Sequence, residues 1–87
     1  MKYVVTRSIN KRLLKDAQFS KFIWNSFAKF KNQDWGDLPL EDKRMNDSAV
    51  KNGDDRIVVR YNSECGDIYI ITEYDRSYTT ILFTHEY

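Results

Sequence analysis

Apolar residues recur at three- and four-residue spacing over residues 17–32, which predicts a helix with a single core-facing stripe. The stripe consists of Phe19, Phe22, Ile23, Phe27 and Phe30. Asp16 precedes this segment and is the expected N-cap, because a short acidic side chain can accept the first free backbone N–H groups. Trp24 falls at the edge of the stripe, where it either extends the core or forms a partly exposed anchor for a partner.

Two shorter helical segments flank the long one. Ser8 is expected to cap a first helix that runs through Ile9, Leu13 and Leu14. A third helix is predicted over residues 40–52, and Gly53 supplies a left-handed stop at its end. The third helix has few apolar residues, so we expect it to pack at the periphery of the domain.

Segments rich in β-branched and aromatic residues occur at both ends of the chain. They predict a first strand over residues 2–6 and three more over 56–62, 68–73 and 78–84. Gly66 is expected to take a positive φ in the turn between the second and third of these strands. Because short turns join the last three strands, each of them should run antiparallel to its neighbour.

The predicted element order is β-α-α-α-β-β-β. It indicates an α+β fold, in which two to three helices pack on one face of an antiparallel sheet of three to four strands. Residues 1–87 are expected to form one domain, since a chain of 87 residues has no room for two. The expected contact layer between the long helix and the sheet consists of Phe22, Ile23, Phe27, Ile70, Ile71 and Leu82.

Charge is distributed unevenly along the chain, although the formal net charge is only +1. Residues 1–33 contain eight basic residues and one acid, whereas residues 34–87 contain six basic residues and twelve acids. Halves of opposite sign either neutralise each other at the surface or present two charged surfaces to different partners.

Residue types that carry catalysis are scarce. Cys65 and His85 are the single cysteine and the single histidine, too few for an internal disulfide or a structural zinc site. The adjacent acids Glu41 and Asp42 point to different helix faces and form no general acid–base pair. We therefore expect no enzymatic activity, no metal and no cofactor. With no membrane-spanning apolar run and no signal-peptide core, a cytoplasmic location is expected.

Several segments resemble one known group of proteins. They include DWGDL at residues 34–38, EDK at residues 41–43 and ITEYDRSYTTILF at residues 71–83. In these segments the chain is similar to small plasmid- and phage-borne bacterial proteins called "plasmid-related protein", some of which are labelled as a restriction-system subunit. The chain departs from the usual pattern of that family at Tyr74 and Thr84, which flank the last predicted strand.

The resemblance implies a non-enzymatic anti-defence protein, an anti-CRISPR or anti-restriction inhibitor that binds a host nuclease complex as a monomer or homodimer. Acidic side chains on a rigid frame suit a basic nucleic-acid channel. The residues expected to contact the partner are Asp34, Trp35, Asp37, Glu41, Asp42, Asp47, Asp75 and Arg76. Two of these expectations have a structural alternative. Trp35 can instead fold back onto the long helix, and Asp75 and Arg76 can instead complete their own turn.

A second hypothesis is nucleic-acid binding by the basic helices. The side chains involved would be Lys11, Arg12, Lys15, Lys21, Lys29 and Lys31, with Trp24 available to stack on a base. The nearly neutral total charge and the absence of a recognition motif weigh against it. A third hypothesis is an assembly module that associates with itself through its sheet.

Overall fold

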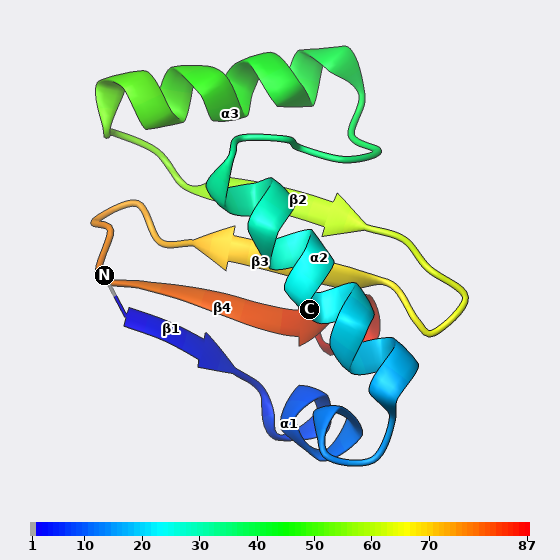
Figure 1. The fold of residues 1–87 in the computed structure, drawn as a ribbon. Coiled ribbons are helices and arrows are strands. Elements are labelled where there is room, and N and C mark those ends of the chain that lie inside the picture. The colour runs from blue at the N-terminus through cyan, green and yellow to red at the C-terminus, as the bar shows by residue number, and fades with distance from the viewer. Residues whose placement is uncertain (1) are drawn as a thin grey trace.

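The computed structural model describes residues 2–87 and has the predicted order of elements (Figure 1). The elements are β1 (Lys2–Val5), α1 (Arg7–Leu13), α2 (Ala17–Lys31), α3 (Leu40–Asn52), β2 (Ile57–Tyr61), β3 (Ile68–Thr72), β4 (Tyr78–Phe83) and a short 3-10 helix, η1 (Thr84–Glu86). The α+β class is confirmed. In Figure 1, α2 crosses the sheet, α1 lies near the β1 edge and α3 lies near the β2 edge.

The four strands form one mixed sheet with the order β1-β4-β3-β2. The pairs β2–β3 and β3–β4 are antiparallel, as their short turns predict. The pair β1–β4 is parallel, so the expectation of a purely antiparallel sheet is wrong. The direction of β1 could not be read from turn length, because three helices and two strands separate it from β4 along the chain.

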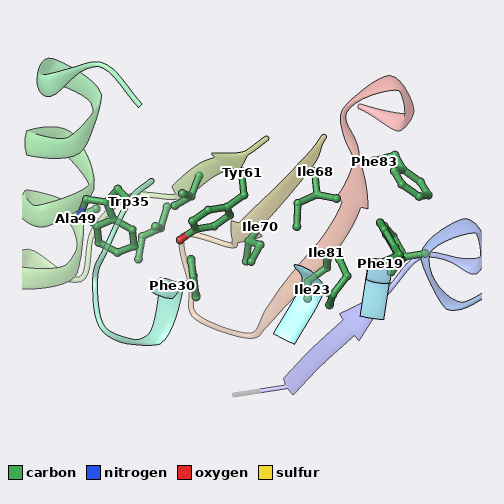
Figure 2. Packing of buried hydrophobic residues seen from close by; sticks show 13 residues of the cluster. Phe19, Ile23, Phe30, Trp35, Ala49, Tyr61, Ile68, Ile70, Ile81 and Phe83 are labelled. Carbon is green, nitrogen blue, oxygen red and sulfur yellow. The ribbon is translucent and has the colours of Figure 1, made fainter. Parts of the chain in front are cut away.

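One layer of the core lies between α2 and the sheet (Figure 2). Phe19 is fully buried there and stacks on Phe83, with ring centroids 5.4 Å apart. Toward the other end of the layer, Phe30 packs beside Trp35. The buried cluster contains Ile9, Phe19, Ile23, Phe30, Trp35, Ala49, Ile57, Val59, Tyr61, Ile68, Ile70, Ile81 and Phe83.

The predicted contact layer is correct for Ile23 and Ile70, which belong to this cluster. Phe22 and Phe27 are only partly buried and pack against its margin, because the stripe that faces the sheet is centred on Phe19, Ile23 and Phe30. Two further residues of the predicted layer, Ile71 and Leu82, are buried but lie outside the cluster. Successive strand residues point to opposite faces, so neighbours of Ile70 and Ile81 along the strands cannot also face α2.

The caps of the first two helices hold the chain where it leaves β1. Asp16 caps α2 as predicted, since its Oδ1 accepts the N–H of Phe19 at 3.0 Å. The cap of α1 is Thr6 rather than Ser8; its Oγ1 accepts the N–H of Ile9 at 3.3 Å. Strand β1 ends at Val5, so the helix begins two residues earlier than the sequence suggested. The Phe19 N–H and the Arg12 guanidinium hold the pKa of Asp16 below its usual value.

Loss of the α2 cap is expected to be measurable. Asp16→Ala should lower the free energy of unfolding by about 1 kcal/mol, and Asp16→Asn by less because the amide oxygen can still accept the N–H. Since folding lowers the pKa of Asp16, its charge stabilises the fold above the unfolded-state pKa and this contribution is lost in acid. Urea unfolding at neutral and acid pH should therefore show that wild type and Asp16→Ala differ less in free energy of unfolding in acid. A difference in free energy of unfolding that grows in acid would contradict this prediction.

The two edges of the sheet differ. At the β2 edge, α3 presents the buried Asn46, whose Nδ2 donates to the Val58 carbonyl at 3.0 Å. The Val58 N–H donates back to Asn46 Oδ1 at 3.3 Å. One amide side chain thus pairs with the edge strand as a neighbouring strand would. No element covers the β1 edge in the part of the chain that is described, residues 2–87.

Candidate functional site

The acidic loop, residues 34–42, runs from the end of α2 into the first turn of α3. It contains four acidic residues and no basic one. Its start is fixed to the sheet, because the Tyr61 hydroxyl donates to the Asp34 carbonyl oxygen at 2.7 Å. Gly36 has a φ of 62°, and a Cβ there would lie 2.9 Å from the Tyr61 ring. Burial and the nearby Asp34 carboxylate raise the pKa of Tyr61 above its usual value, so this hydroxyl stays a donor further into alkaline pH than an exposed tyrosine would.

Trp35 is buried rather than presented to a partner, with 4% of its surface exposed. Its ring packs edge-on against Phe30, and its Nε1–H donates to Asp47 Oδ1 at 2.7 Å. The expectation that Trp35 is a surface anchor is therefore wrong for this conformation. The alternative, in which Trp35 folds back onto the long helix, describes its position better. The acceptor of its indole N–H is a carboxylate. Asp47 is held by the same bond and so is less available to a partner than the other acids.

Asp37, Glu41 and Asp42 are exposed. Within residues 2–87, their carboxylates make neither a hydrogen bond nor an ion pair; the two ion pairs are Arg12–Asp16 and Arg60–Asp67. Glu41 and Asp42 also lie in the first turn of α3, at the positive end of its helix dipole. These three carboxylates are therefore open to solvent and unpaired within residues 2–87.

The acids of the predicted set do not share one surface. Asp42 and Asp47 are five residues apart on α3, which places them about 140° apart around its axis. Asp42 lines a groove of about 450 Å³ that also contains Tyr69. Asp34 and Asp37 line a separate groove of about 350 Å³. The structure therefore places the acids of the loop beside two separate grooves and leaves Asp47 on another side of α3.

Asp75 and Arg76 lie at the far end of α3 and have structural partners. Asp75 Oδ1 accepts the Ser77 N–H at 3.0 Å, and hydrogen bonds from Ser77 lower the pKa of Asp75. Arg76 has a φ of 61°, and its guanidinium donates to the carbonyl oxygens of Ala49 and Asp55. Arg76 thus ties the β3–β4 turn to the end of α3, and its charge faces backbone rather than solvent.

A second surface lies beside β1. Trp24 is 65% exposed, which agrees with its interpretation as an exposed residue rather than a core residue. Its ring lies edge-on to Phe27, and Phe27 in turn lies edge-on to Tyr3, with centroids 4.9 Å apart. The Lys31 ammonium lies 5.5 Å from the Phe27 ring centre. Sequence reasoning missed Tyr3, because its exposure depends on β1 being an edge strand.

The groups that these two surfaces present are carboxylates, lysine ammonium groups and aromatic rings. No group of three or more His, Cys, Asp or Glu side chains that could hold a metal occurs among residues 2–87. No helix there is long and apolar enough to cross a membrane. No family model, curated protein or solved structure matches this chain.

Proposed function

We propose that this chain is a non-enzymatic anti-defence protein, an anti-CRISPR or anti-restriction inhibitor that binds a host nuclease complex through its acidic loop. The observation that carries the proposal is the group of exposed carboxylates of Asp37, Glu41 and Asp42, which have no cationic partner within residues 2–87. The similarity of the DWGDL and EDK segments to mobile-element proteins supports the same function, since both segments lie in or beside this loop.

Rigidity supports the proposal as well. A loop that binds through charge loses less entropy when its backbone is already held, and this loop is fixed by Tyr61 at its start and by Trp35 within it. Its carboxylates resemble phosphates in sign and project from a fixed frame. Such a loop would compete with nucleic acid for a basic channel and would accelerate encounter with it.

The test is a double charge reversal. Asp37→Lys combined with Asp42→Lys should leave the melting temperature within about a few degrees of wild type, because exposed charges contribute roughly 0–1 kcal/mol each. Binding to the host CRISPR effector or restriction complex should weaken at least about tenfold, mostly through a slower association rate at low salt. Association kinetics at two salt concentrations and a DNA-cleavage assay by that complex measure both effects.

The matched control reverses two charges on the opposite surface. Lys11→Glu combined with Lys15→Glu should change binding and inhibition far less. If this control abolishes activity while the acidic-loop variant keeps it, the proposal fails. It also fails if the purified chain neither binds nor slows any nuclease complex of its host.

Nucleic-acid binding is the second candidate, and one observation favours it. Lys21, Trp24 and Lys31 project from one side of α2, and the indole of Trp24 is exposed enough to stack on a base. Weighing against it, Arg12 is already paired with Asp16. Gel-shift titration with single-stranded and duplex DNA at two salt concentrations decides: no binding at low salt eliminates this candidate.

A further inference from the structure

Strand β1 has an open edge with unpaired backbone groups. The N–H groups of Lys2 and Thr6 donate to Ser77 and Ile81 at the β4 side. Because backbone groups alternate along a strand, the N–H and C=O of Tyr3 and Val5 point away from β4. At the opposite edge of the sheet, the side chain of Asn46 on α3 pairs with the N–H and C=O of Val58, whereas no group among residues 2–87 pairs with the outward N–H and C=O of Tyr3 and Val5.

Exposed apolar side chains lie directly beside this edge. Tyr3 is 51% exposed, Val5 40% and Trp24 65%. They line an apolar pocket of about 140 Å³, to which Leu13 and Phe27 also contribute. An added strand would therefore meet free hydrogen-bonding groups along the edge and an apolar pocket on the α2 side, the two elements of strand addition.

Charge indicates the chemistry of the occupant. Lys2, Lys21 and Lys31 are exposed on the elements that form this surface, and β1, α1 and α2 contain no acidic residue. A second copy of this chain, paired through β1 about a twofold axis, would bring a second set of these lysines to the surface and no acidic residue on β1, α1 or α2 to pair with them. A segment with acidic residues around an apolar centre complements the surface, whereas a nucleic acid would leave the β1 backbone groups unpaired.

We propose that the β1 edge binds an extended, acidic and apolar segment of a partner protein, which adds to the sheet as a fifth strand next to Tyr3 and Val5. Main-chain hydrogen bonds to these two residues hold the segment. Its apolar side chains occupy the pocket beside Trp24, and its acidic side chains face Lys21 and Lys31. This inference does not rest on the acidic loop, which lies near the other edge of the sheet.

The probe is a short fluorescent peptide with acidic residues at both ends and alternating valine and threonine between them. We expect it to bind the full chain and to slow hydrogen exchange at the amides of Tyr3 and Val5. A peptide of the same centre with lysines at both ends should bind at least about tenfold more weakly. Failure of the acidic peptide to bind at millimolar concentration would overturn the proposal.

A proline substitution separates the possible occupants. Val5→Pro removes an N–H that points away from β4, so it spares the β1–β4 hydrogen bonds. Val5→Pro should weaken peptide binding at least about tenfold, and Trp24→Ala should do the same. Met45→Ala is the control, since Met45 is an exposed apolar residue on α3, and it should leave peptide binding unchanged. The circular dichroism spectrum and melting temperature of Val5→Pro verify that it is folded.

Three further outcomes would overturn the proposal. The first is that folded Val5→Pro binds the peptide as wild type does. The second is that single-stranded oligothymidylate binds the wild type more tightly than the acidic peptide and binds Val5→Pro equally well, which would assign the surface to nucleic acid. The third is a stable homodimer in sedimentation that Val5→Pro dissociates, which would assign the edge to a second copy.

Discussion

Phe19→Ala is expected to lower the free energy of unfolding by about 3–5 kcal/mol, the usual range for truncating a fully buried phenylalanine. Phe19 has no exposed surface and stacks on Phe83. The Arg12 guanidinium also lies 4.9 Å from its ring centre. Because domains of this size have a total stability of roughly 5–15 kcal/mol, the variant should melt far below wild type or fail to fold. Urea unfolding and calorimetry measure the loss.

Phe27→Ala is the matched control, since it removes the same ring from the same helix. Phe27 is only partly buried, and its main ring contacts are the exposed residues Tyr3 and Trp24. Truncating a side chain that is partly exposed to solvent removes less buried apolar area than truncating a fully buried one. The Phe27→Ala variant should therefore remain folded, and its free energy of unfolding should fall clearly less than that of Phe19→Ala. Equal losses for the two variants would show that α2 faces the sheet differently from the structure described here.

Local patterns predicted the helices and the antiparallel strands because their causes lie within a few residues. Asp16 could be identified as a cap because capping joins it to an N–H only three residues away. Gly53 takes a left-handed conformation at the end of α3, as its place after Asn52 indicated. The parallel pairing of β1 with β4 joins residues more than seventy positions apart, and no local pattern encodes that choice.

Some features of the candidate surfaces likewise follow from local sequence, and others depend on contacts between distant segments. The exposure of Asp37 and Asp42 followed from a polar segment with few apolar residues. The burial of Trp35 did not, because it depends on the α2–α3 loop folding back until the indole reaches Asp47, twelve residues away. Tyr3 could not be recognised as a surface residue, because a strand exposes its edge only once the order of strands in the sheet is known.

Asn46→Asp tests how α3, and with it the acidic loop, is held on the sheet. The amide of Asn46 donates to the Val58 carbonyl and accepts the Val58 N–H. An ionised carboxylate can still accept, but it cannot donate, and it would face the carbonyl oxygen in a buried site. We expect a loss of about 2–4 kcal/mol at neutral pH. Asn46→Ala should cost somewhat less, because it leaves unpaired groups without adding a buried charge.

The pH dependence distinguishes this mechanism from general damage to the core. Burial next to a carbonyl oxygen should raise the pKa of the introduced carboxyl above its unfolded value of about 3.9. The protonated form can donate to Val58, so the stability deficit relative to wild type should be smallest below about pH 4 and should grow as pH rises through the raised pKa. The deficit of Asn46→Ala should stay nearly constant over the same range. Parallel pH profiles of the two variants would mean that the donor to Val58 is not what holds α3 at the β2 edge.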